Sequence, residues 1–178
     1  MKNGVVYAIA GTIAVIVLVA FSIVESGWIP ARADATPGAV ETWIAKTSLD
    51  ATIHREAPSQ ANPVPETDVN LLHGVRLFAT NCAICHGTAR GTADASPIAK
   101  GLYQKPPQLA SEGVEDDAEG ETFWKVKHGI RLTGMPSFAV TLTDEEIWTL
   151  ALFLRHMDKL PPDVQRAWED VRNWPAAP

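Results

Sequence analysis

One short run of residues constrains this chain more than any other: Cys82-Ala83-Ile84-Cys85-His86. It places two thiols three positions apart and puts an imidazole directly after the second thiol. Each thiol can add to one vinyl group of a porphyrin, and the imidazole then lies where it can ligate the iron. The run therefore predicts one covalently attached haem c, bound by Cys82 and Cys85, with His86 as an iron ligand.

Two other kinds of site use closely spaced cysteines. A thioredoxin-like dithiol has the same Cys-x-x-Cys spacing, but it does not need the histidine, and no strand–helix–strand pattern surrounds the motif. A structural zinc site needs four ligands, and the chain has neither a second Cys-x-x-Cys nor a His-x₃-His pair. The chain has two cysteines, both in the motif, so haem attachment leaves no structural disulfide.

A second iron ligand is expected about fifty residues downstream, at Met135. Gly134 and Pro136 flank this methionine and favour a constrained loop over a helix. Such a loop can present the thioether to the iron. The other methionines are poorer candidates, because Met1 is the first residue and Met157 continues the apolar face of a predicted helix.

The remaining histidines are weaker ligand candidates. His128 ends a predicted short helix that Gly129 caps, a position where a cation is favourable, and it is kept as the alternative iron ligand. His54, His73 and His156 lie in helical contexts beside charged or polar residues, and we expect them in solvent.

The charge of the chain limits its partners. Its formal net charge is −6, which argues against nucleic-acid binding because that function requires a basic surface. It permits a basic redox partner. The acidic segment 112–121 is predicted to be a solvated loop with a helix N-cap at Asp116 or Asp117, and a calcium site is the alternative there.

The N-terminal residues predict a membrane helix. Residues 5–24 are uncharged and mostly apolar, and a helix of that length spans roughly 30 Å, the thickness of the hydrocarbon core. Lys2 precedes the run and Glu25 follows it, so the positive-inside rule places the terminus in the cytoplasm and the rest outside. A cleaved signal peptide is the alternative, since residues 31–33 resemble a cleavage site.

These patterns divide the chain into four regions. Residues 1–25 are the membrane anchor or an uncleaved signal, and residues 26–66 are a proline-rich connector with a short amphipathic helix. Residues 67–160 form the haem domain, and residues 161–178 form a tail with a short helix and Trp174. The apolar stripe of the connector, whose helical spacing slips near Ser48, consists of Val40, Trp43, Ile44, Leu49 and Ile53.

Two helices are expected to begin and end the haem domain. The first starts near Thr67 and Asp68, whose side chains can cap a helix, and runs into the cysteine motif. The last starts at a capping box formed by Thr143 and Glu146. It is expected to stop at residues 161–162, which are both proline.

The cysteine motif and the Met135 loop together resemble a class I cytochrome c with one haem, of the membrane-anchored bacterial type. The resemblance covers the haem domain and implies an all-α fold of a few short helices around one covalent haem. It also implies that the first and last helices cross closely, where Gly74 and Phe78 meet Leu150 and Phe153.

The resemblance also suggests roles for residues outside the two ligand motifs. In this family a proline loop supplies a carbonyl that orients the ligating imidazole, so the carbonyl of Pro106 or Pro107 is the expected acceptor, unless the loop is a simple turn. Arg131 is expected to hold a haem propionate, unless it is simply a surface residue. Trp124 and Tyr103 are further candidate donors to a propionate.

The predicted ligand set favours electron transfer. Two strong protein ligands leave no open site on the iron, which opposes oxygen or peroxide chemistry and suits one-electron exchange. The sequence predicts an electron-transfer protein, not an enzyme, tethered to the periplasmic side of an inner membrane, with protein redox donors and acceptors and no small-molecule substrate. The alternative is the cytochrome subunit of a larger membrane oxidoreductase. A haem-based gas sensor or peroxidase would require Met135 to be displaced.

Overall fold

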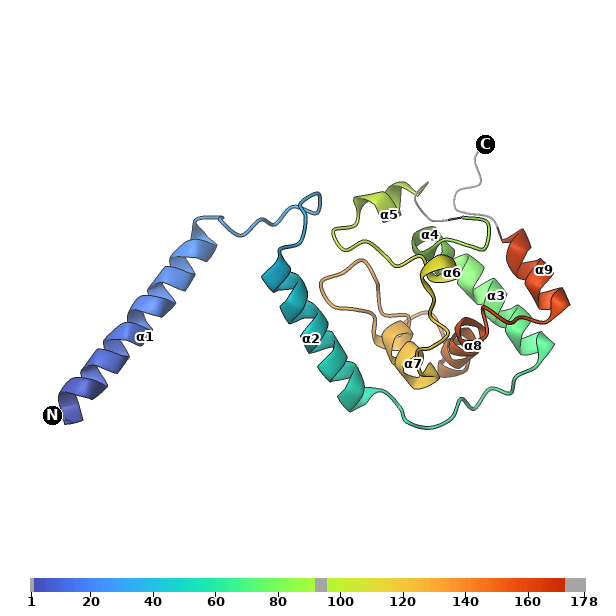
Figure 1. Cartoon of the computed structure of the whole chain (residues 1–178), viewed down its shortest axis with the longest axis horizontal. Helices are drawn as coiled ribbons and strands as arrows, with labels where there is room; N and C mark the ends of the chain where they lie inside the picture. Colours follow the sequence, from blue (N-terminus) through green and yellow to red (C-terminus); the bar gives the residue numbers. More distant parts are fainter. Residues whose placement is uncertain (1, 92–95, 172–178) are drawn as a thin grey trace. The chain divides into compact units, whose positions relative to one another are not determined.

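The computed structural model describes residues 2–91 and 96–171, and the regular structure in that part of the chain is helical (Figure 1). This confirms the predicted all-α class. The chain divides into two compact units, Met1–Ala35 and Thr36–Pro178. The helices are α1 (Lys2–Glu25), α2 (Ala39–Glu56), α3 (Asp68–Asn81), α4 (Ala83–His86), α5 (Pro97–Gly101), α6 (Leu109–Glu112), α7 (Glu119–His128), α8 (Asp144–Arg155) and α9 (Pro162–Asp170).

The first unit is built on α1. Its segment Asn3–Glu25 has 23 residues with a mean hydropathy of 2.5, and none of its most apolar window is buried. Exposed side chains such as Val17 and Leu18 surround the helix on all sides, a pattern that suits lipid and not water. The helix is therefore long and apolar enough to cross a membrane, a test that a signal sequence near an N-terminus also passes.

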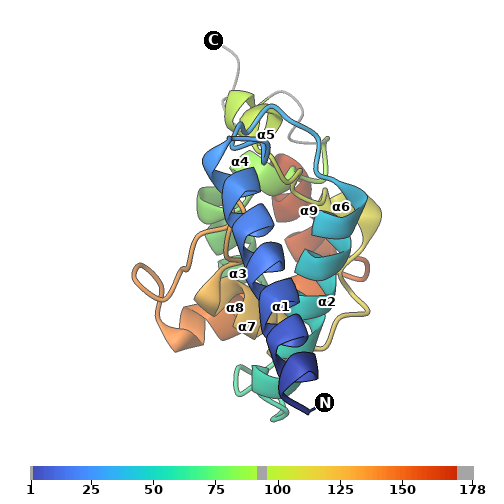
Figure 2. The ribbon, with the colours of Figure 1, turned by 90° about the vertical axis from the view of Figure 1, so that its left-hand side faces the viewer.

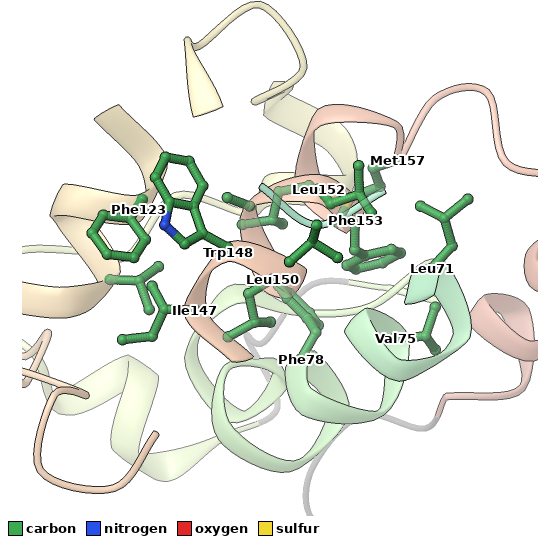
Figure 3. Packing of buried hydrophobic residues seen from close by; sticks show 14 of the residues in the cluster. Leu71, Val75, Phe78, Phe123, Ile147, Trp148, Leu150, Leu152, Phe153 and Met157 are labelled. Carbon is green, nitrogen blue, oxygen red and sulfur yellow. The ribbon is translucent and has the colours of Figure 1, made fainter. Parts of the chain in front are cut away.

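The core of the second unit is the crossing of α3 and α8 (Figure 3). A Cβ atom on Gly74 would lie 2.5 Å from the Cβ of Phe153 and 2.9 Å from the carbonyl oxygen of Thr149, so the two helices touch where glycine allows it. Phe78 and Phe153 are fully buried and meet edge to face, with ring centroids 5.8 Å apart. The predicted close crossing is confirmed.

Helix α7 packs on the other side of α8. Phe123 and Trp148 stack with centroids 4.3 Å apart and an interplanar angle of 19° (Figure 3). This contact fixes α7 on the core, and α7 leads directly into the loop that carries Met135.

The predicted helix starts are confirmed for α3 and α8. The Thr67 hydroxyl accepts from the backbone N–H of Asn70, and Thr143 and Glu146 form the reciprocal capping box. The predicted end of α8 is wrong, since α8 stops at Arg155. Pro162 instead lies in the first turn of α9, where a missing N–H and a fixed φ are tolerated.

Helix α9 is part of the core. The Trp168 ring lies 5.3 Å from the rings of both Phe78 and Phe153, and Trp168 is 3% exposed. Val164, one turn earlier, is fully buried. The α9 helix thus covers the α3–α8 crossing, while Trp174 of the predicted tail lies outside the described residues.

Helix α2 lies along α7 on the surface of the second unit (Figures 1 and 2). Its apolar residues occupy two faces, which explains the slip in their spacing near Ser48. Val40, Trp43 and Ile44 are exposed by 69%, 67% and 55%, whereas Ile53, closer to the C-terminal end, is 4% exposed and faces the domain. The expected single stripe is therefore two separate apolar faces, one exposed and one packed against the domain.

Candidate functional site

The cysteine–histidine motif continues directly from α3. The Cys82 N–H donates to the carbonyl of the buried Phe78 at 2.8 Å, and α4 starts at the next residue. The N–H groups of Cys85 and His86 then donate to the Cys82 carbonyl at 3.0 and 2.9 Å. Gly87, with φ of 74°, ends the turn in a conformation that favours glycine. The core helix thus fixes the backbone of all three predicted haem-binding residues.

The His86 ring is oriented by a backbone carbonyl. Its Nδ1 lies 2.8 Å from the oxygen of Pro107, and because a carbonyl can only accept, Nδ1 carries the proton. The lone pair is therefore on Nε2, the atom that a metal would bind. Burial lowers the pKa of His86, against the opposing effects of the Pro107 carbonyl and Glu112. A neutral imidazole is the form that ligates iron.

The thiol chemistry argues against a redox-active dithiol. Burial, aided by the neighbouring Cys85, raises the pKa of Cys82 to about 12, and burial also raises the pKa of Cys85. A dithiol that exchanges electrons needs an easily ionised thiol, with a pKa below the ordinary value. Among the described residues, no positive neighbour lowers the pKa of either thiol, so the arrangement fits thiols that are consumed by a covalent bond to a cofactor.

A single segment connects the histidine side to the methionine side. The side-chain amide of Gln108 donates to the carbonyls of Cys85 and Pro106, at 3.1 and 2.9 Å, and so ties the proline loop to the motif. At the other end of this segment, Leu102 lies against Gly134, where a Cβ atom would overlap the leucine side chain. The segment that orients His86 therefore also touches the loop that carries Met135.

The Met135 loop is closed by its own short hydrogen bonds. Ile130 donates its N–H to the Met135 carbonyl at 3.1 Å, and the Met135 N–H donates to the Thr133 hydroxyl at 3.1 Å. Met135 is half-buried against the core, while its neighbours Gly134 and Pro136 are exposed. The residues around Met135 thus form a loop and not a helix, as the flanking glycine and proline predicted, and Met135 packs against the core.

Gly129 makes this loop geometry feasible. Its φ is +66°, and a Cβ atom there would lie 2.5 Å from the carbonyl carbon of Pro136 and 2.7 Å from the carbonyl oxygen of Met135. It also caps α7, as predicted, by donating its N–H to the backbone carbonyl of Lys125. The exposed His128 precedes it, with its ring 5.1 Å from that of Trp124.

The candidate propionate partners have different surroundings. Arg131 is exposed, and its guanidinium has no partner among the described residues. The Tyr103 hydroxyl donates to Glu41 of α2 at 2.7 Å, so it is already engaged. Trp124 is 8% exposed and belongs to the buried face of α7.

Two expectations about polar residues need correction. His156 is half-buried and not in solvent, because its Nδ1 lies 2.9 Å from the Leu152 carbonyl and its Nε2 lies 3.3 Å from a Glu66 carboxylate oxygen. The N-cap of α7 is Ala118, not Asp116 or Asp117. No cluster suited to a metal ion occurs within the described residues, so the calcium alternative for the acidic segment gains no support.

Sequence reasoning missed the contact between α9 and the loop after the motif. Arg90 pairs with the Asp170 carboxylate at 2.9 Å and also donates to the Glu169 carbonyl. The spacing of Val164 and Trp168, one helical turn apart, was the signal that this helix has a buried face.

Comparison with known proteins agrees with this site. Residues 69–154 match the family model described as cytochrome C oxidase, cbb3-type, subunit III. Cytochrome c6 of Parathermosynechococcus lividus is 31% identical over 85 residues, which are 48% of this chain and 87% of that protein.

The chain belongs to the class I c-type cytochromes. As a member of this family, the cytochrome carries covalently attached haem c and transfers electrons. One of the subunits of nicotinate dehydrogenase from Pseudomonas putida is 30% identical over 105 residues, 55% of this chain but 8% of that much longer protein. A chain of the reducing HAO-like protein complex of Kuenenia stuttgartiensis superposes with a TM-score of 0.42 at 24% identity, covering 55% of the cytochrome and 48% of that chain.

The residues present fit the haem that the family implies. Two cysteines are free for thioether bonds, the Pro107 carbonyl leaves Nε2 of His86 available, and a half-buried methionine lies on the loop beside Leu102. The residues present thus include one nitrogen donor and one sulfur donor, the pair that can ligate iron in electron-transfer haem proteins.

Proposed function

We propose that His86 and Met135 would hold the haem iron of this electron-transfer cytochrome. The observation that carries the proposal is the 2.8 Å contact between His86 Nδ1 and the Pro107 oxygen, because it reserves the other ring nitrogen for a metal. The contact of Leu102 with Gly134 supports Met135 as the second ligand, since it joins the two loops. Within this proposal Cys82 and Cys85 form the thioethers.

The haem, when bound, supplies a one-electron redox couple. The protein's own residues orient and shield it: Pro107 fixes the tautomer of His86, and Gln108 holds the proline loop against the motif. The Met135 thioether and the His86 imidazole, if both held the metal, would leave it no site for a substrate. Arg131, exposed and without a partner among the described residues, is proposed to bind a propionate.

We further propose that α1 anchors the cytochrome in an inner membrane, with the second unit on the periplasmic side. The apolar span of α1 supports the anchor, and Lys2 before the span, with Glu25 after it, supports this orientation. Attachment of haem to Cys-x-x-Cys-His is expected outside the cytoplasm, which agrees with that side. Flotation of the full chain with lipid vesicles and the intact mass of the mature protein test the anchor, because cleavage after residue 33 would remove it.

A second candidate is a cytochrome subunit that remains bound to a catalytic partner. The match to a segment of a nicotinate dehydrogenase favours it, because a domain of this kind is there part of a larger protein. Purification in mild detergent separates the two candidates. A stoichiometric complex favours the second candidate, and an isolated cytochrome favours the membrane-anchored electron carrier.

The reduced absorption spectrum and a carbon monoxide challenge test the ligand assignment. We expect the sharp bands of low-spin, six-coordinate haem c and no rapid binding of carbon monoxide, since His86 and Met135 would both hold the iron and leave no site for the gas. A high-spin spectrum with rapid, complete binding would instead favour a gas sensor or peroxidase.

A further inference from the structure

The outer face of α2 is apolar although α2 already packs against the domain on its other side. Val40, Trp43 and Ile44 recur at the i, i+3, i+4 spacing that shares one helix face, and all three are more than half exposed. Thr47 and Ala51 continue the same face, so it carries no charge over its first four turns.

The opposite face of α2 accounts for its position on the protein. Ile53 is buried, and Leu49, one turn earlier, is half-buried. Pro58, just after α2, contacts Gly120 of α7 so closely that a Cβ atom on that glycine would overlap the Pro58 carbonyl. At the other end, Glu41 accepts from Tyr103 at 2.7 Å. The helix is thus fixed at both ends, and no described residue covers its apolar outer face.

A short stretch of chain joins this face to the candidate membrane helix. Residues 26–38 separate α1 from α2; that length spans at most about 45 Å when fully extended and about 20 Å on average as a flexible chain. The three exposed apolar residues lie in the first two turns of α2, which is the end nearest to this tether. Trp28, next to the end of α1, is 80% exposed, and tryptophan is enriched at membrane interfaces.

We propose that Val40, Trp43 and Ile44 bind the lipid interface of the membrane that α1 spans. This inference rests on the anchoring role of α1 proposed above. A helix with an apolar face and charged flanks lies in the plane of an interface, and Lys46, Asp50 and Arg55 provide such flanks. The contact would fix the orientation of the haem domain at the membrane instead of leaving it on a free tether.

Lipid crosslinking in the full-length, haem-loaded protein tests the proposal. Haem attachment consumes Cys82 and Cys85, so a cysteine introduced by Val40→Cys is the single reactive thiol and can carry a benzophenone. Val69→Cys is the matched control, because Val69 is also the second residue of a helix and is 74% exposed, close to the 69% of Val40. Both proteins are placed in vesicles of phosphatidylethanolamine and phosphatidylglycerol, irradiated and analysed by mass spectrometry.

We expect at least fivefold more lipid adduct at position 40 than at position 69. Adding Trp43→Ser to the Val40→Cys protein should lower this adduct at least threefold without changing flotation, because α1 still anchors the chain. Equal adducts at the two positions, or an adduct with a second protein chain at position 40, would overturn the lipid contact of α2 but not the anchoring role of α1. A chain that does not float with vesicles would overturn the anchor and the inference together.

Discussion

His86 lies on a helical turn that continues from the buried helix α3, whereas Met135 lies on a loop that is largely exposed and closed by local hydrogen bonds. The histidine side is held by contacts between residues far apart in sequence, such as His86 with Pro107 and Gln108 with Cys85. The methionine side depends on the backbone conformation of a few neighbours, Gly129 above all. We infer that the histidine side is the rigid half of the site. The methionine side is the half that determines how readily an iron ligand is lost.

Replacing the methionine ligand should produce the largest change. Met135→Leu keeps the volume of the side chain but removes the sulfur, so the iron loses one ligand and the midpoint potential falls. Potentiometric titration measures the fall, and carbon monoxide should now bind. Met157→Leu is the control, because Met157 is 6% exposed in the core and should leave the potential unchanged. Equal potentials in the two variants would contradict the assignment of Met135.

Adding one methyl group at Gly129 should weaken the methionine side selectively. Gly129→Ala forces a positive φ on alanine and brings its Cβ against the Met135 and Pro136 backbone, at a cost of about 1–3 kcal/mol. Chemical denaturation of the reduced protein measures the total cost, and carbon monoxide binding reports opening of the loop. Gly101→Ala is the matched control, since nothing lies within 4 Å of a Cβ there. Equal stability and equal carbon monoxide binding in the two variants would contradict a special role for Gly129.

Loosening the histidine side should lower the free energy of unfolding by less and leave the absorption spectrum unchanged. Gln108→Ala removes the amide that donates to the carbonyls of Cys85 and Pro106, and we expect a loss of about 1 kcal/mol in the free energy of unfolding. The His86–Pro107 contact and α3 should still hold the imidazole, so the low-spin bands remain. Gln165→Ala, which removes an amide that donates to Glu169 of the same helix, is the control for the loss of an amide. A high-spin spectrum for Gln108→Ala would show that the remaining contacts do not hold His86 in place.

The smallest effect is expected at the contact between α2 and the segment that joins the histidine side to the methionine side. In this contact Tyr103 donates to Glu41. The hydrogen bond from Tyr103 to Glu41 raises the pKa of Tyr103 above its usual value of about 10. The stabilisation from this bond is therefore complete below the usual pKa and is lost as the pH rises through the raised value. Glu41→Gln should lower the phenol pKa, as measured by ultraviolet titration with Tyr103→Phe as the reference for Tyr7. An unchanged titration would show that α2 does not stabilise the segment that contains Tyr103.

Much of the rigid half followed from the sequence, because its signals are local. The caps Thr67 and Thr143 and the close approach at Gly74 rest on short patterns with one physical solution. The place of Trp168 and the partner of Tyr103 did not follow, since both depend on how distant segments meet. The apolar residues of α2 were visible in the sequence, but only the tertiary packing shows that they form two faces.

The ligand pair itself is tested most directly by nuclear magnetic resonance of the reduced protein with labelled methionine methyl groups. The chain has three methionines, and a methyl group on a sulfur bound to the iron lies over the porphyrin, whose ring current shifts its resonance far upfield. We predict one such resonance, absent in Met135→Leu and retained in Met157→Leu. No upfield methyl in the native protein, or one that survives Met135→Leu, would contradict the account.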